Sequence, residues 1–266
     1  MNIKSFSLFF LVSINVLFAQ LSDYNFRAIN TSNGLSNNTV SSIAQDKTGQ
    51  MWFATSNGLN KYNGIAFTVY RNLPGDEYSI SSSEVLNVLV DRDGNVWAGT
   101  FNGLNRYNPE KNTFKRYYRR PSNKHSLSNS LVISSLEMRN GNIWFGTANG
   151  VSIYEKKKDR FIRFLQGNTK TGSRAINDIV RDKKNNIWLA TNNGIVKVER
   201  DENHKFSYEE YRINTERTDF QVNKILEISP NLIGIATRFD GYLIFNINTE
   251  QFSRPNRINI PHDIYV

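Results

Sequence analysis

A short phrase recurs four times in this chain and restricts its fold more than any other feature. It reads WFATSNGLNKY from Trp52 onward, and near-copies begin at Trp97, Trp144 and Trp188. These tryptophans are spaced 45, 47 and 44 residues apart, and a degenerate fifth unit has Gly234 in the tryptophan position, 46 residues later. Repeats of this period are typical of solenoids or propellers.

Each unit contains strand and turn signals in a fixed order. The first unit opens with apolar residues three apart, Val40 and Ile43, and continues with a D-x-x-G turn at 46–49. After the tryptophan strand comes Asn-Gly, as at 57–58, where we expect a type I′ hairpin turn with positive φ at both residues. A third strand follows, and then an aromatic, basic fourth strand. The expected fourth strands cover 66–70, 113–118, 160–164 and 205–211.

Four recurring positions within the phrase indicate packing rather than chemistry. The tryptophan and the small residue two positions later share a strand face, which suits close contact between sheets. Threonine and the hairpin glycine suit the turn that follows. We therefore assign structural roles to Trp52, Thr55, Gly58, Trp97, Thr100, Gly103, Trp144, Thr147, Gly150, Trp188, Thr191 and Gly194.

Four antiparallel strands repeated at this period predict an all-β propeller over residues 23–266. A β-solenoid is the alternative, but its coils usually have shorter periods. Two further segments resemble strands without partners, a fourth strand at 26–29 and a first strand at 262–266. We therefore expect five blades plus two orphan strands, as an incomplete part of a ring of about seven blades. A closed five-bladed ring with tails is the alternative.

The N-terminus has the pattern of a secretory signal peptide. Lys4 precedes an apolar stretch at 6–18, and the small residue Ala19 follows it. The apolar stretch is short for a membrane span. We interpret residues 1–19 as a signal peptide, with an uncleaved anchor as the alternative, and expect a periplasmic protein.

The chain of 266 residues carries a net charge of +9 and has no cysteine. Disulfides and thiolate metal sites are therefore excluded. A basic surface favours anionic partners such as acidic glycans, lipid headgroups or nucleic acid, although spread charges also occur on solvated loops. Nucleic acid is disfavoured, because no nucleic-acid-binding motif is present and an exported chain rarely meets it.

The opening GLSN at 34–37, followed by D-x-x-G, tryptophan, threonine and Asn-Gly up to Tyr62, resembles the two-component regulator propeller repeat. SLSNSLV at 126–132 matches the same opening in the third unit. The resemblance implies the periplasmic sensor region of a hybrid histidine kinase of glycan-degrading bacteria, which detects oligosaccharides and controls polysaccharide-use genes. It also implies a possible homodimer of the full-length sensor. This sequence contains no kinase, nucleotide-binding or receiver motif, so we expect no enzyme activity and no cofactor.

Three hypotheses for function remain open. A ligand sensor would use the face that carries the interblade loops and the turns between second and third strands. The candidate ligand-binding residues there are Arg119, Arg120, Lys124, His125, Phe101 and Phe239. An enzyme similar to streptogramin lyases would need a divalent metal, but His125, His204 and His262 do not have metal-ligand spacing. A structural or adhesive propeller is the third hypothesis.

Overall fold

The computed structural model describes residues 26–167, 175–200, 206–214 and 220–255. Within them the chain forms five antiparallel sheets of four consecutive strands each, which we call blade 1 to blade 5 in chain order. Two short 3-10 helices, η1 (Thr31–Asn33) and η2 (Lys156–Lys158), lie outside the sheets. No helix among the described residues has the length and hydropathy required to cross a membrane.

The strands correspond closely to the units of the repeat. Blade 1 contains β1 (Val40–Gln45), β2 (Met51–Thr55), β3 (Gly58–Tyr62) and β4 (Phe67–Tyr70). Blade 2 contains β5 (Val85–Val90), β6 (Val96–Thr100), β7 (Gly103–Asn108) and β8 (Thr113–Tyr117). Blade 3 contains β9 (Val132–Glu137), β10 (Ile143–Thr147), β11 (Gly150–Glu155) and β12 (Arg160–Phe164). Blade 4 contains β13 (Asp178–Arg181), β14 (Ile187–Ala190), β15 (Gly194–Arg200) and β16 (Phe206–Arg212). Blade 5 contains β17 (Val222–Ser229), β18 (Leu232–Thr237), β19 (Tyr242–Asn246) and β20 (Gln251–Ser253).

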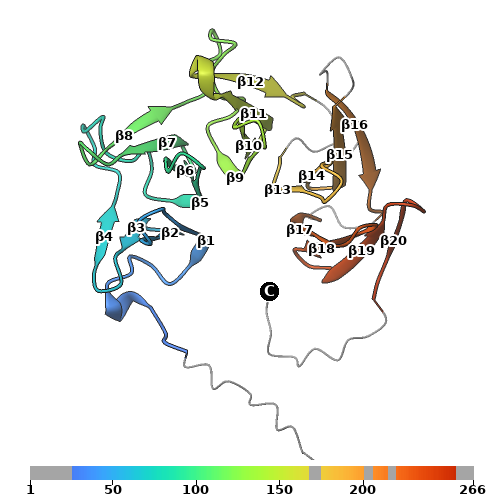
Figure 1. Ribbon diagram of the computed structural model, residues 1–266, viewed down its shortest axis with the longest axis horizontal. Coiled ribbons are helices and arrows are strands. Elements are labelled where there is room, and N and C mark those ends of the chain that lie inside the picture. Colours follow the sequence, from blue (N-terminus) through green and yellow to red (C-terminus); the bar gives the residue numbers. More distant parts are fainter. Residues whose placement is uncertain (1–25, 168–174, 201–205, 215–219, 256–266) are drawn as a thin grey trace, which may run out of the picture.

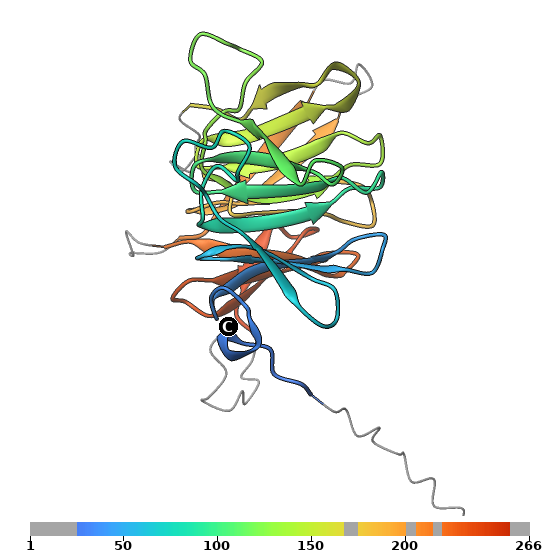
Figure 2. The same cartoon turned by 90° about the vertical axis from the view of Figure 1, so that its left-hand side faces the viewer.

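The blades form an open arc, with the first strand of each blade innermost and the fourth outermost (Figure 1). Successive inner strands β1, β5, β9, β13 and β17 contact one another, whereas a gap separates blade 5 from blade 1. Figure 2 shows the blades from the side as stacked sheets. The expectation of an all-β propeller whose ring is not closed is confirmed.

The two ends of the arc expose side chains that the other interfaces bury. Val85 and Val88 of blade 2 are 1% and 4% exposed, because blade 1 covers them. The equivalent Ile43 of blade 1 is 56% exposed. At the other end, Leu226 of blade 5 is 60% exposed, whereas the equivalent Leu89 packs into the core between blades 2 and 3. The interior of the arc is therefore built from interfaces between successive blades.

In blades 1, 2 and 4 an aspartate–tryptophan hydrogen bond explains why a turn aspartate lies six residues before the tryptophan. Trp52 Nε1 donates to Asp46 Oδ2 at 2.8 Å, and the same bond joins Trp97 to Asp91 at 3.1 Å. Trp188 donates likewise to an aspartate of its own turn. The carboxylate thus satisfies the only polar atom of a buried indole. Blade 3 has Met138 at the aspartate position.

The serine of the GLSN opening ties the interblade loop to the hairpin of its own blade. Ser36 Oγ lies 2.8 Å from Thr55 Oγ1, and Thr55 donates to the carbonyl of Gly58 at 2.9 Å. The buried Asn60 donates to Ser36 Oγ and accepts from its N–H. Ser81 and Ser128 make the same contact with the threonines of blades 2 and 3. In blades 1 to 3 this serine therefore fixes where the loop meets its sheet.

The expected type I′ turns at Asn-Gly are wrong. Positive φ is found at the glycines, such as 132° at Gly58 and 122° at Gly103, but not at the preceding asparagines. Thr55 pairs directly with Gly58, so Ser56 and Asn57 form the two-residue tip of the turn. Threonine holds this geometry, because its hydroxyl accepts from the asparagine N–H and donates to the glycine carbonyl. Only the glycine therefore needs positive φ.

The expected orphan strand at 26–29 is also wrong. These residues form no strand, and Phe26 is 94% exposed. A strand needs a partner for its backbone groups, and β20 already forms the outer edge of blade 5. The second expected orphan strand, at 262–266, and the expected signal peptide at 1–19 lie outside the described residues.

Asp46 predicts a pH dependence of stability. Partial burial opposes ionisation, but hydrogen bonds from the Thr48 hydroxyl, the Trp52 indole and two backbone N–H groups outweigh it and lower the pKa of Asp46. A lowered folded-state pKa stabilises the fold above the unfolded pKa of about 4, and this contribution disappears as pH falls through the folded value. Asp46→Asn should therefore destabilise the protein at pH 7 and progressively less towards pH 3. Urea unfolding across this range measures the difference, and a difference that does not change with pH would contradict the assignment.

Candidate ligand-binding surface

The interblade loops and the turns between second and third strands lie on one face of the arc, which we call the loop face. Phe101 N–H in the β6–β7 turn donates to the carbonyl of Glu84 at 3.1 Å, and Gly103 N–H donates to that of Ser130 at 2.6 Å. In blade 5, Arg238 N–H of the β18–β19 turn donates to the carbonyl of Gln221. All six candidate ligand-binding residues are in loops or turns of this face.

The loop from 118 to 131 joins β8 to β9 and carries four of the six. Arg163 of β12 holds it in place: the guanidinium donates to the carbonyls of Ser126 and Asn123 at 3.0 and 2.8 Å, and to Ser126 Oγ at 2.7 Å. Asn123 Oδ1 accepts from the N–H of His125 at 2.8 Å. The backbone of this loop is therefore fixed independently of its exposed side chains.

The structure places two of the basic candidates, Arg120 and His125, at a small cleft, whereas Arg119 and Lys124 belong to the same loop but do not line it. Arg119, Arg120 and Lys124 are exposed, and their charged groups have no hydrogen-bond or ion-pair partner among the described residues. Arg120 and the half-buried His125 line a cleft of about 230 Å³ on the outer rim, between β8 and the start of β12. Lys115, Tyr118, Asn123 and Asp159 also line it.

Asp159 is the one carboxylate of this cleft. It accepts hydrogen bonds from the hydroxyls of Tyr117 and Tyr154, at 3.1 and 2.8 Å, and pairs with Lys115. Partial burial opposes its ionisation, but the bonds from Lys115 and the tyrosines outweigh this and lower the pKa of Asp159. Its negative charge is therefore already neutralised within the protein, and the cleft keeps an excess of positive charge.

The two aromatic candidates are not brought together with the basic loop into a single pocket. Phe101 and Phe239 are 56% and 52% exposed, and they belong to blades 2 and 5, which lie in different parts of the arc (Figure 1). The guanidinium of Arg238 lies 5.0 Å from the centre of the Phe239 ring, in cation–π contact. Neither phenylalanine lines the cleft beside Arg120.

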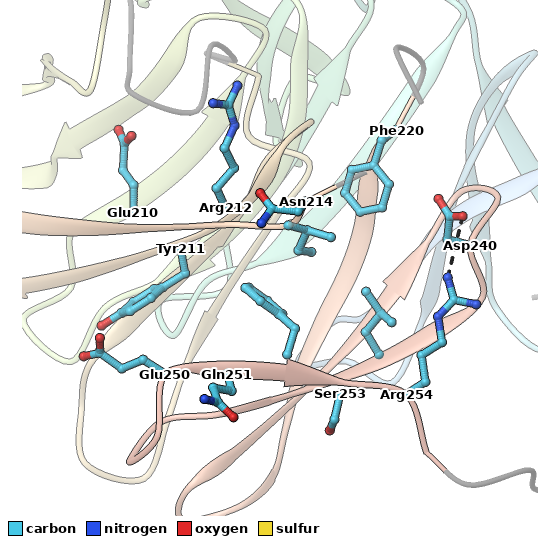
Figure 3. A pocket seen from close by; sticks show the side chains of 13 residues that line it. Glu210, Tyr211, Arg212, Asn214, Phe220, Asp240, Glu250, Gln251, Ser253 and Arg254 are labelled. Atoms are coloured by element: carbon cyan, nitrogen blue, oxygen red, sulfur yellow. Dashed lines mark ion pairs between the residues drawn. The ribbon is translucent and has the colours of Figure 1, made fainter. Parts of the chain in front are cut away.

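Sequence reasoning missed a larger cavity of about 660 Å³ between the outer strands of blades 4 and 5. Tyr211 and Phe252 form part of its apolar wall, and Figure 3 shows Glu210 and Arg212 on β16 and the pair Asp240–Arg254, 4.0 Å apart, at another side. Its residues come from β16 and β20 with their flanking residues, from the β18–β19 turn, from Leu243 of β19 and from Phe220. No local motif links these segments, so only the tertiary structure reveals the cavity.

Tyr211 lines this cavity, with its hydroxyl beside Glu250 (Figure 3). Its ring packs against Phe245, with centroids 4.6 Å apart, and its hydroxyl donates to Glu209 at 2.6 Å. Burial, and then the neighbouring carboxylates, raise the pKa of Tyr211 well above its usual value. The hydroxyl therefore remains a neutral hydrogen-bond donor near the cavity.

A metal-dependent active site has no support among the described residues. They contain no group of three or more His, Cys, Asp or Glu side chains able to hold a metal ion. Of the three histidines, His204 and His262 lie outside the described residues. The described part of the chain consists of propeller blades and their connections.

Comparison with known proteins agrees with this architecture. Residues 34–57, 79–102 and 172–193 match the family described as two component regulator propeller. An 82-residue stretch is 46% identical to a protein named Histidine kinase P4 of Formosa agariphila and spans 30% of this chain but 6% of that protein.

Solved structures share the fold. The extracellular domain of a putative hybrid two component system of B. thetaiotaomicron is 23% identical, with a TM-score of 0.55 over 88% of this chain and 37% of that one. Virginiamycin B lyase of Staphylococcus aureus, solved with quinupristin, is 18% identical, with a TM-score of 0.58 over 82% of this chain and 71% of that one.

The fold and the ordered repeat define a β-propeller. Three segments of the chain match the two component regulator propeller, in agreement with the resemblance noted in the sequence.

Proposed function

We propose that this chain is the extracytoplasmic ligand-sensing propeller of a hybrid two-component sensor that detects oligosaccharides and controls polysaccharide-use genes. The observation that carries the proposal is the match of three segments of one arc to the two component regulator propeller family. The stretch shared with a histidine kinase supports the link to a kinase, which would be a separate region of the full-length sensor.

The signal pattern at 1–19 and the likeness to the extracellular domain of a two component system support a periplasmic location. In this arrangement the propeller meets a ligand outside the membrane while the kinase acts inside. A homodimer of the full-length sensor is part of this proposal, because a ligand that changed the contact between two copies would provide a route for the signal.

The loop face and the cavity between blades 4 and 5 offer groups suited to sugars. Oligosaccharides present hydroxyls that both donate and accept, and Arg, Glu, Asn and Gln side chains satisfy both roles. The cavity combines such side chains with the rings of Tyr211 and Phe252, and its volume is within the range of small-molecule sites.

A panel of oligosaccharides tests the proposal by thermal unfolding of the purified protein. A ligand present at about 100 times its Kd adds about 2.7 kcal/mol to the free energy of unfolding, which raises the melting temperature by several degrees. The matched monosaccharides serve as controls for non-specific sugar effects. Equal melting temperatures across a panel that includes neutral, carboxylated and sulfated oligosaccharides would overturn the proposed ligand class.

A further inference from the structure

Two interblade loops of this chain have the same backbone but different charges. The first loop (71–84) joins β4 to β5, and the second loop (118–131) joins β8 to β9. Their hydrogen bonds coincide at positions 47 residues apart. The shared bonds run from the N–H of Asn72 and Arg119 to Ser83 and Ser130 Oγ, from Leu73 and Arg120 to Ser79 and Ser126 Oγ, from Tyr78 and His125 to Asp76 and Asn123 Oδ1, and from Phe114 and Phe161 to the carbonyls of Tyr78 and His125.

Both loops are also held by an equivalent arginine. Arg116 donates to the carbonyls of Ser79 and Asp76 and to Ser79 Oγ, as Arg163 does to the carbonyls of Ser126 and Asn123 and to Ser126 Oγ. The guanidiniums of Arg116 and Arg163 are thus used in holding the fold. They are distinct from the exposed basic residues of the second loop.

From the second position of each loop onward, the second loop is more positively charged than the first wherever the formal charges of paired residues differ. The paired positions, first loop before second, are Asn72 and Arg119, Leu73 and Arg120, Asp76 and Asn123, Glu77 and Lys124, Tyr78 and His125, and Glu84 and Leu131. Every one of these differences that alters formal charge either removes a negative charge or adds a positive one. Because the first loop holds the same backbone without these cations, the fold does not require them in the second.

The first position of each loop differs in the opposite direction, with Arg71 paired to Tyr118. Arg71 Nε donates to the backbone carbonyl of Asn57 at 3.1 Å, in the β2–β3 turn of its own blade. This guanidinium therefore already has a partner within the protein, unlike the cations of the second loop.

The cations of the second loop are available to a ligand. Arg119, Arg120 and Lys124 are exposed and have no side-chain partner in the described part of the chain. Partial burial, and then the like charge of Arg119, lower the pKa of Arg163, the arginine that holds this loop. An anion placed there would relieve this repulsion and accept charge-assisted hydrogen bonds from guanidinium groups.

We propose that the exposed side of the second loop, beside the cleft that Arg120 lines, binds the oxyanion groups, carboxylate or sulfate, of an anionic oligosaccharide, with Arg119, Arg120 and Lys124 as the ligand-binding cations. This inference rests on the proposed function and specifies the charge class and the place of the ligand. The planar guanidiniums supply paired N–H donors for an oxyanion, and Lys124 supplies a point charge. Equivalent positions in the first loop carry Asp76 and Glu77, which would repel the same ligand.

The test measures binding of size-defined oligogalacturonate, dextran sulfate oligosaccharide and uncharged maltooligosaccharide to the purified protein by calorimetry. The test variant combines Arg119→Asn with Lys124→Glu and so gives each position the residue type that the first loop carries. We expect one anionic probe to bind, with affinity that falls as salt rises, and the variant to bind it about tenfold or more weakly. Whichever of the two anionic probes binds identifies the oxyanion.

A charge-matched control separates a local effect from net charge. Arg139→Asn with Lys111→Glu changes net charge equally, but at exposed positions in turns opposite the loop face, and should leave binding unchanged. Equal weakening by both variants, or binding that neither variant weakens, would overturn the inference. Binding of the neutral probe alone would overturn it while leaving the sensor proposal standing, whereas a protein that binds no glycan would overturn both.

Discussion

Replacing Trp97 by alanine should lower the free energy of unfolding by about 3–5 kcal/mol. Trp97 is 1% exposed and lies between blades 2 and 3, with its ring 4.8 Å from that of Tyr154 and 5.5 Å from that of Phe145. Truncation removes these contacts and leaves a cavity between two sheets. It also removes the indole N–H that donates to the buried Asp91. Urea unfolding with an unchanged m-value measures the loss.

Trp97→Phe is the matched control for the two contributions. It retains an aromatic ring but leaves the Asp91 carboxylate without the indole donor, which should cost about 1–3 kcal/mol. The Trp97→Ala variant should therefore have a clearly lower free energy of unfolding than Trp97→Phe. If alanine cost less than about 1 kcal/mol, Trp97 would not be the centre of the interface between the two blades.

Gly146→Ala should destabilise the protein by about 1–3 kcal/mol, although it adds a single methyl group. A Cβ at Gly146 would lie 2.6 Å from the carbonyl oxygen of Ile176 and would also collide with Ser134 Oγ. The carbonyl belongs to the backbone that leads into blade 4, so the blade as a whole would have to move away. A melting temperature lowered by several degrees is the expected result.

Ala236→Val is the control, because Ala236 occupies the same register position in blade 5, where no further blade packs in the described arc. Ala236→Val should therefore lower the free energy of unfolding by less than Gly146→Ala does. Equal losses at the two positions would show that the cost comes from within each sheet and not from the contact between blades.

The sequence predicted the blades well because each recurring residue has a local partner. The aspartate bonds the tryptophan six residues later, the threonine caps its own hairpin, and the serine of the opening reaches that threonine. Such contacts repeat with the unit and leave a readable pattern. The hairpin type was mispredicted because Asn-Gly was assumed to be the two central residues, whereas the threonine shifts the turn by one position.

The candidate site could be predicted only in part. A dense basic segment such as 119–125 is visible in a sequence. The structure shows that its cations are exposed and that Arg163 holds the backbone of the loop by hydrogen bonds. The cavity beside Tyr211 is not visible, because Glu210, Asp240 and Glu250 come together only through the packing of blade 5 on blade 4. The difference between the two loops likewise required the hydrogen bonds that establish their equivalence.

Sensing of an external glycan by this propeller can be measured in the organism that carries the gene. The measurement is transcription of polysaccharide-use genes on exposure to the glycan that binds the purified protein, in the wild type and in a strain with an in-frame deletion of residues 26–255. We expect induction to be lost in the deletion strain and restored by the intact gene. Unchanged induction without these residues would contradict this expectation.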